Sequence, residues 1–297
     1  MLLEQPSRIP HPGRILVIGD VHGDIDRLMT ILISTHIFSP SLEWIAQPRS
    51  THVVQLGDQL DSMHRGGNPD WEQHTDIDVL FMMNRLDEIA AAGGGRVISL
   101  IGNHETLNMA SQFMFVSDKS MTTTGVGRRV DLFKPGTGMC SYILSTRNVV
   151  VQIGPYIFCH GGLLPEHLEL VNNDFDVINT VFRKYARAEQ LTAYETNILK
   201  CAITNENSIL WNRILFNMLP DETYVEQVMD NILQRTNSTC MFVGHNTVDN
   251  IKGVANSKLF FVDAGLSRSY PFDRVQVLEI HTHNNVDSVD IIELRNI

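Results

Sequence analysis

Side chains able to bind metal ions recur after several strand-like segments of this 297-residue chain. They are carboxylate, imidazole and amide groups: Asp20, His22, Asp58, Asn103, His104, His160 and His245. A single Asp after a strand is usually a turn or a helix cap, so the recurrence carries the signal. Such donors suit Mn, Fe or Zn, and their number exceeds the need of one tetrahedral zinc ion. Two ions about 3.5 to 4 Å apart that share one carboxylate could activate water and clamp a phosphoryl group.

Glycines lie beside nearly all of these side chains: Gly19, Gly23, Gly57, Gly102, Gly161, Gly162 and Gly244. Glycine adopts backbone conformations that other residues resist. The pattern therefore predicts tight turns that aim the polar side chains toward a common point.

The elements that must position these groups alternate between strands and helices. The segment from Arg14 to Asp20 is a short apolar run that predicts a buried strand, and apolar residues at helical spacing over Asp24 to Phe38 predict a helix capped by Asp24. The same order follows with a strand over Thr51 to Asp58, a helix near Asp76 to Ala92, and a strand and helix start over Arg96 to Glu105. Alternation of this kind indicates an α/β sheet with helices on its faces.

Six later segments predict the strands of a second sheet: Asn148 to Ile153, Tyr156 to Gly162, Cys240 to Asn246, Lys258 to Gly265, Arg274 to Ile280 and Val289 to Leu294. Residues of about 165–235 are mostly helical in pattern, and no Gly/Ser-rich linker separates them from the strands. We therefore expect one domain over residues 1–297, with the helical segment packed beside the sheets.

Composition narrows the classes of function. A hydrophobic share of 43% is ample for a continuous core, and a formal net charge of -11 argues against binding to nucleic acid or anionic membranes. Four widely spaced cysteines without a C-x-x-C pair suggest neither a thiolate zinc site nor a disulfide framework. No stretch approaches the roughly 20 apolar residues that cross a bilayer. We expect a cytoplasmic protein whose oligomeric state the sequence leaves open.

Five motifs follow one another in a characteristic order: GDVHG from Gly19, GDQLD from Gly57, GNHE from Gly102, HGG from His160 and GH from Gly244. In this order they resemble the calcineurin-like metallophosphoesterases, in particular the phosphoprotein phosphatase branch. Their details are similar to the Shewanella-like and other bacterial-type members. The resemblance implies an α/β (α+β) fold, a four-layer sandwich of two mixed β-sheets flanked by helices.

The resemblance also implies roles for the residues in these motifs. Asp20, His22 and Asp58 would bind the first metal ion, and Asp58, Asn103, His160 and His245 the second. His104 would act as the general acid, with Asp61 orienting its ring. A hydroxide bridging the two ions would attack phosphorus directly. Imidazole suits proton donation because its ordinary pKa lies near neutrality.

Two arginines are candidates for binding the phosphate. Arg213, in the segment LWNR, resembles the W-x-R arginine of the bacterial-type phosphatases. Arg65 departs from the family pattern, in which Arg-Gly follows the GDxxD motif directly, because three residues separate Arg65 from Asp61. Either a longer loop brings Arg65 to the phosphate or the contact is lost.

Two further segments have no assigned chemistry. The irregular loop from His64 to Asp76 could shape substrate access or simply lie on the surface. The pair Arg128-Arg129 could meet an acidic partner, but we expect it on a solvated helix face.

We predict a metal-dependent phosphatase that acts on phosphorylated proteins or small phosphoesters. The segment from Val262 to Tyr270 does not match the ending of the common Ser/Thr phosphatases, so phosphotyrosine remains open beside phosphoserine and phosphothreonine. A bis(5'-nucleosyl)-tetraphosphatase-like hydrolase is the first alternative, since such enzymes share the metal motifs and the W-x-R arginine. A non-catalytic, metal-stabilised interaction protein is the second, although complete motifs argue against it.

Overall fold

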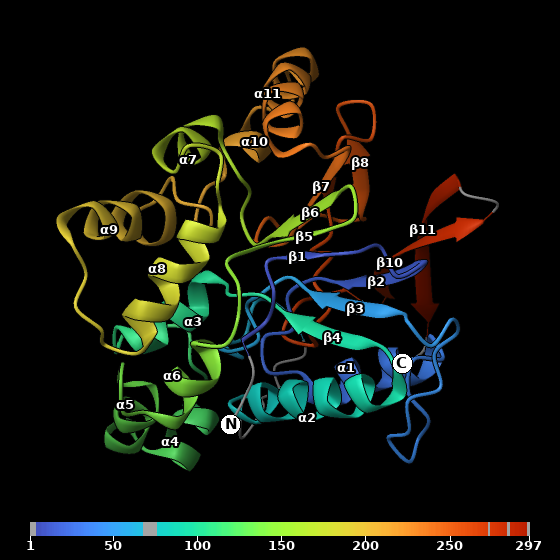
Figure 1. Ribbon diagram of the computed structural model, residues 1–297. Coiled ribbons are helices and arrows are strands. Elements are labelled where there is room, and N and C mark those ends of the chain that lie inside the picture. Colours follow the sequence, from blue (N-terminus) through green and yellow to red (C-terminus); the bar gives the residue numbers. More distant parts are fainter. Residues whose placement is uncertain (1–3, 68–75, 273, 284–285, 296–297) are drawn as a thin grey trace.

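The computed structural model describes residues 4–67, 76–272, 274–283 and 286–295, and two β-sheets lie at its centre (Figure 1). The first sheet has the order β11 (Val286–Arg295), β10 (Arg274–His283), β2 (Arg14–Ile18), β3 (His52–Gln55) and β4 (Arg96–Ser99). The second has the order β1 (Arg8–Ile9), β5 (Val150–Ile153), β6 (Tyr156–Cys159), β7 (Cys240–Val243), β9 (Leu259–Phe261) and β8 (Lys252–Val254). Both sheets are mixed, with parallel central strands and antiparallel neighbours.

Helices cover the outer face of each sheet. Below the first sheet in Figure 1 lie α1 (Ile25–Ser34) and α2 (Asp78–Gly93), which share one apolar core with its strands. The second sheet packs against a larger helical layer: α7 (Pro165–Leu170), α8 (Asp176–Ala186), α9 (Ala193–Ile198), the π-helical turn η1 (Leu199–Thr204), α10 (Ile214–Asn217) and α11 (Glu222–Thr236). The predicted helical segment of about 165–235 is thus present.

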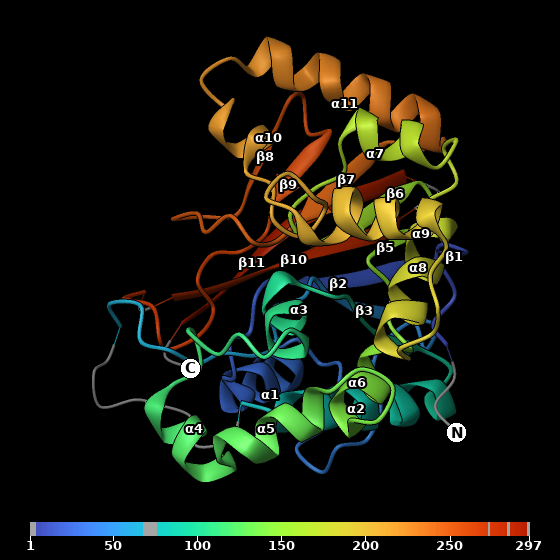
Figure 2. The same ribbon diagram turned by 90° about the vertical axis from the view of Figure 1, so that its left-hand side faces the viewer.

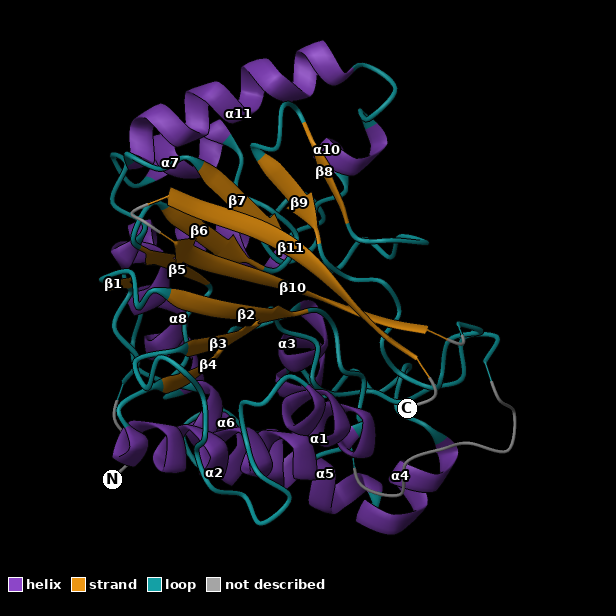
Figure 3. Ribbon diagram, turned by 90° about the vertical axis from the view of Figure 1, so that its right-hand side faces the viewer, coloured by secondary structure: helices purple, strands orange, loops and turns teal. Residues whose placement is uncertain are grey.

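A third apolar core joins the two sheets to each other. Val17 and Ile98 of the first sheet pack in this core with Phe158 and Phe242 of the second, and all four side chains are fully buried. Figure 3 shows the two sets of strands layered one on the other between the helices. The arrangement is helix, sheet, sheet, helix, which confirms the expected four-layer sandwich.

The last two strands correct one expectation. The segments from Arg274 and from Val289 were assigned to the second sheet, whereas β10 and β11 extend the first, with Ile280 opposite Ile15 of β2. Strand β10 is buried on both faces: Val277 packs toward the helices and Leu278 toward the second sheet. Apolar patterning marks such a segment as a buried strand but does not specify its partner.

A group of four short helices connects β4 with β5: α3 (Asn103–Met109), α4 (Asp118–Thr124), α5 (Val126–Phe133) and α6 (Met139–Leu144). Figure 1 and Figure 2 show α4 and α5 at the edge of the molecule, and α5 packs against α3, α4 and α6. The helices predicted over Asp24 to Phe38 and near Asp76 to Ala92 are present as α1 and α2, with slightly different bounds. Helix α1 starts after Asp24, whose carboxylate accepts from the Arg27 amide at 3.1 Å.

Candidate active site

The predicted metal-binding residues follow the carboxyl ends of parallel strands. Strands β2, β3 and β4 are parallel neighbours in the first sheet, and β6 and β7 are parallel neighbours in the second. Because the sheets are stacked, the loops after these strands meet at one edge, as in other open α/β sheets. A cavity of about 280 Å³ lies there, lined by Asp20, His22, Asp58, Asn103, His104 and His245 among the predicted metal and acid residues. His160 is fully buried next to Asp58.

Several of these residues hold a backbone conformation that side chains other than glycine rarely adopt. The φ angles are +44° at His22, +51° at Asp58, +68° at Asp61 and +62° at His245. Such left-handed backbone is costly, and it persists where the surrounding structure fixes it, often at functional sites. Gly23, Gly57 and Gly162 also have positive φ angles, so the predicted glycines and the four polar residues share the unusual backbone of these turns.

Three imidazoles have one ring nitrogen tied to a backbone carbonyl. Nδ1 of His22 lies 3.0 Å from the Leu60 carbonyl, and Nδ1 of His160 lies 2.9 Å from the Leu56 carbonyl. In His245 it is Nε2 that lies 3.0 Å from a carbonyl, that of Trp211. With these nitrogens as donors, the opposite nitrogen of each ring keeps a free lone pair, which is the arrangement that metal-binding histidines need.

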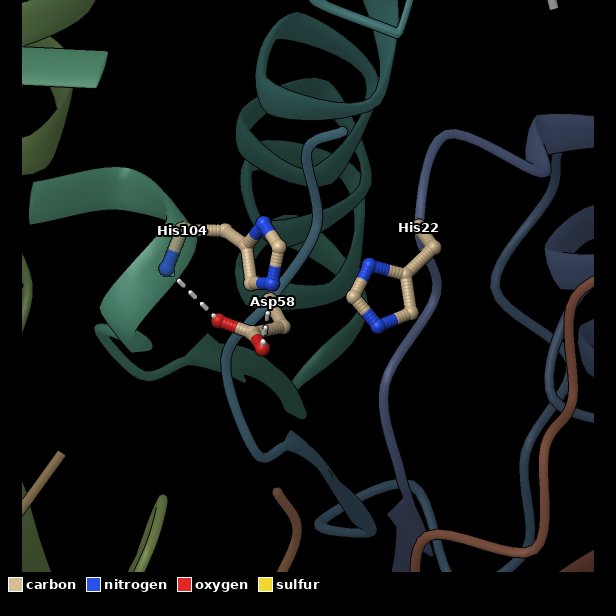
Figure 4. A group of neighbouring side chains, drawn as sticks. All are labelled: His22, Asp58 and His104. Carbon is tan, nitrogen blue, oxygen red and sulfur yellow. Dashed lines mark hydrogen bonds and ion pairs between the residues drawn. The ribbon is translucent and has the colours of Figure 1, made fainter. Parts of the chain in front are cut away.

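The donor atoms converge on Asp58. The Nε2 atom of His160 lies 3.2 Å from Asp58 Oδ2 and 2.9 Å from Asn103 Oδ1. Two sets of three side chains each bring ligand atoms within 4.8 Å of one another: His22, Asp58 and His104, and Asp58, His160 and His245. Asp58 belongs to both sets. Figure 4 shows its carboxylate between His22, which lies on a loop, and His104, which lies at the start of helix α3.

Asp20 contacts the same group of metal-binding side chains through His22 and His245. Its Oδ2 lies 4.0 Å from His22 Nε2 and accepts the backbone N–H of His245 at 3.2 Å. Burial and the nearby carboxylates of Asp263 and Asp58 raise the pKa of Asp20 well above its usual range. Buried carboxylates this close together need compensating positive charge. The donor chemistry and this crowding of carboxylates fit two metal ions that share Asp58.

His104 and Asp61 form a pair behind the cavity. Nδ1 of His104 donates to Asp61 Oδ2 at 2.7 Å, so Nε2 is the nitrogen directed to the cavity, 3.7 Å from Asp58 Oδ2. Burial disfavours the charged imidazole, but Asp58 and Asp61 outweigh burial and raise the pKa of His104. The ring also contacts that of Phe115, with centroids 5.0 Å apart. A hydrogen bond from Nδ1 to a carboxylate suits proton transfer by Nε2, the role that the motif implies for His104.

Both candidate arginines line the cavity. The longer loop brings Arg65 back: its guanidinium donates to the carbonyls of Asp61 and Met63 at 3.0 and 2.9 Å and lies 5.5 Å from the ring centre of Tyr270. The exposed Arg213 donates to the His245 carbonyl at 3.2 Å. The longer loop thus brings Arg65 to the wall of the cavity, and its contact with phosphate stays a prediction. Residues 68–75 of the His64–Asp76 loop lie outside the described residues.

One buried residue near the site has no role in the sequence analysis. Glu105, the last residue of GNHE, accepts the backbone N–H groups of Asp58, Gln59 and Gly102 at 2.9, 2.9 and 2.7 Å. It thus fixes the loop that carries Asp58. Its place in the motif could have suggested this function.

The expectation for Arg129 was wrong. Arg128 is exposed on α5, but Arg129 is fully buried and pairs with Asp61 and Asp76. Arg129 and Phe133 lie one helical turn apart and are the buried residues of α5, so the arginine shares the inward stripe of the helix with Phe133.

Known proteins resemble this chain along most of its length. It is 24% identical to Shewanella-like protein phosphatase 2 of Arabidopsis thaliana, over 94% of this chain and 78% of that protein. It is 25% identical to Shewanella-like protein phosphatase 1 of Plasmodium berghei (strain Anka), over 86% and 67%. The cold-active protein-tyrosine phosphatase of a psychrophilic Shewanella species has the same fold, with a TM-score of 0.78, 23% identity and coverage of 99% and 83%. The model of the calcineurin-like phosphoesterase family matches residues 13–292, and the chain belongs to that family.

Proposed function

We propose that this chain is a metal-dependent phosphoprotein phosphatase that hydrolyses phosphomonoesters. The observation that carries the proposal is the convergence of nitrogen and oxygen donors on Asp58, beside a carboxylate-paired histidine and two arginines in the same cavity. The similarity to proteins named as phosphatases supports the same reaction. Phosphoserine, phosphothreonine and phosphotyrosine are all candidate substrates.

The metal ligands would be those named from the motifs. Two ions, held by Asp20, His22, Asp58, Asn103, His160 and His245 with Asp58 shared, would supply an activated water and neutralise phosphoryl oxygens. Mn, Fe and Zn all suit these donors.

His104 supplies the proton for the leaving oxygen. Its Nδ1–H is engaged by Asp61, so the proton that moves is the one on Nε2, at the cavity wall. The raised pKa of His104 favours the protonated ring that a general acid requires. Arg213 and Arg65 hold the outer phosphoryl oxygens through charge-assisted hydrogen bonds.

Hydrolysis of p-nitrophenyl phosphate by the purified protein, loaded in turn with Mn, Fe and Zn, tests the proposal. We expect turnover with at least one metal, and we expect His104→Asn to lower kcat by about 100-fold or more. Asp58→Asn should lower both turnover and bound metal, because it removes a charge that both sites share. Unchanged rates in these variants would refute the assignment.

Competition between phosphopeptides and a dinucleotide for the enzyme identifies its substrate class. The phosphatase hypothesis predicts that phosphopeptides are cleaved with a higher kcat/KM than diadenosine tetraphosphate. The reverse order would favour the dinucleotide hydrolase. Bound metal without turnover on any phosphate ester would favour the non-catalytic protein. The expected cytoplasmic location stays a prediction from the sequence; among the described residues, no helix combines the length and apolar character needed to cross a membrane.

A further inference from the structure

Behind the His104–Asp61 pair lies a buried ion-pair network that the reaction outlined above does not use. Arg129, Asp61 and Asp76 are all fully buried. Arg129 donates to both carboxylate oxygens of Asp76, with Nη1 and Nη2 at 2.8 and 2.7 Å. The same Nη2 lies 3.2 Å from Asp61 Oδ1. One guanidinium from the α5 helix is therefore shared by two carboxylates, one of which contacts the proposed general acid.

The network determines which oxygen of Asp61 faces His104. Oδ1 accepts from Arg129 and, at 2.8 Å, from the side-chain amide of Asn108, while Oδ2 is left for His104 Nδ1 at 2.7 Å. Asn108 is held in turn, because its Oδ1 accepts from Arg129 Nε at 2.7 Å. With both oxygens engaged on opposite sides, the carboxylate cannot rotate without breaking charge-assisted hydrogen bonds.

The backbone of Asp61 is held by the Arg129–Asp76 ion pair. Its N–H donates to Asp76 Oδ2 at 2.9 Å, the oxygen that also accepts from Arg129 Nη2. Asp61 has a φ of +68°, a conformation that needs such support. Arg129 and Asp76 therefore contact both ends of the residue that orients His104.

We propose that Arg129 is a positioning residue for proton donation, acting through Asp61 on the His104 ring. This inference rests on the phosphatase activity proposed above. Arg129 does not line the cavity, so it acts on the leaving-group step and not on phosphate binding. Arg129 thereby connects helix α5, which lies between β4 and β5, to the proposed general acid His104.

The test compares two substrates with different leaving groups. Phenolate is a stronger base than p-nitrophenolate and depends more on protonation as it departs. We expect Arg129→Met to lower kcat for phenyl phosphate by about tenfold or more and for p-nitrophenyl phosphate by about twofold, with KM unchanged. Arg128→Met, the same change at the exposed neighbour on the same helix, is the matched control and should leave both rates unchanged.

A double variant shows whether the effect passes through Asp61. In the Asp61→Asn background, Arg129→Met should lower kcat for phenyl phosphate by less than about twofold, because coupled residues are not additive. An independent tenfold loss in that background would overturn the proposal. So would an equal loss on both substrates in Arg129→Met with normal metal content, which is the result of a merely structural role.

Folding and activity controls separate the possible failures. If Arg129→Met does not fold, the substrate ratio is measured in Arg129→Lys, which keeps the charge but not the planar fork. An unchanged ratio in a folded Lys variant overturns the inference while the phosphatase assignment stands. Failure of the wild-type protein with both substrates overturns the proposed function and the inference with it.

Discussion

At the scale of single residues, phosphate binding is assigned to side chains at the rim of the cavity. We expect Arg213→Ala to raise the inhibition constant of inorganic phosphate by about tenfold or more, because a hydrogen bond to a charged group contributes about 1.5–3 kcal/mol. Inhibition of p-nitrophenyl phosphate hydrolysis measures this. The control is Arg235→Ala, which removes an arginine paired with Glu169 in the helical layer. Equal inhibition constants in the two variants would show that Arg213 does not bind phosphate.

At the scale of an element, the turn between β4 and α3 requires glycine. A Cβ atom at Gly102 would overlap the carboxylate and the backbone nitrogen of Asp58. We therefore expect Gly102→Ala to lower metal content and turnover together, measured by elemental analysis and by p-nitrophenyl phosphate hydrolysis. Gly127→Ala is the control, because nothing lies within 4 Å of a Cβ there. That change lies in helix α5 and should stabilise the protein by up to about 1 kcal/mol. Normal metal content in Gly102→Ala would contradict the prediction.

Helix α7 carries a buried histidine whose titration changes stability. Burial, opposed by a bond from its Nε2 to the Asn207 carbonyl, lowers the pKa of His167 to about 4. The unfolded chain binds the proton at higher pH than the folded protein does. The resulting stabilisation is complete above pH of about 6.5 and falls as the pH drops toward 4, by up to about 3 kcal/mol. Denaturant unfolding of wild type and His167→Gln at several pH values measures it. Identical pH dependence in both would exclude His167 as the source.

At the scale of the whole molecule, metal ions should hold the two sheets together at the site edge. Asp20 follows β2 of the first sheet and His160 follows β6 of the second. Four buried carboxylates lie close enough there to interact: Asp20, Asp58, Glu105 and Asp263. Burial is the largest cause that raises the pKa of Asp263, as it does for Asp20. Without cations these carboxylates repel one another.

Removing the metal should therefore lower the melting temperature. Dialysis against a chelator should lower Tm, and added Mn should restore it, because a ligand that binds only the folded state stabilises it by RT ln(1 + [L]/Kd), about 2.7 kcal/mol at 100 times Kd. Scanning calorimetry with and without Mn is the measurement. The Asp58→Asn variant should show a smaller difference. A Tm that does not depend on metal would contradict this account of the site.

The sequence by itself determined the type of chemistry and the strands that carry it. Asp20, Asp58, Asn103, His160 and His245 could be found because each follows a short buried strand, and parallel strands bring their ends to one edge. The four layers followed from the resemblance to a family. A single domain over residues 1–297 stays a prediction, as do the roles of the site residues.

Only the tertiary structure decided what depends on partners distant in the chain. The sheet that β10 joins, the return of Arg65 to the cavity and the burial of Arg129 are all set by contacts between distant segments. The helix propensity of an arginine is the same whether its side chain is solvated or buried beside two carboxylates. The two cases differ only in the charged partners that the fold brings next to the side chain. Local patterns specify elements and their chemistry, whereas pairing across the fold specifies which charges meet.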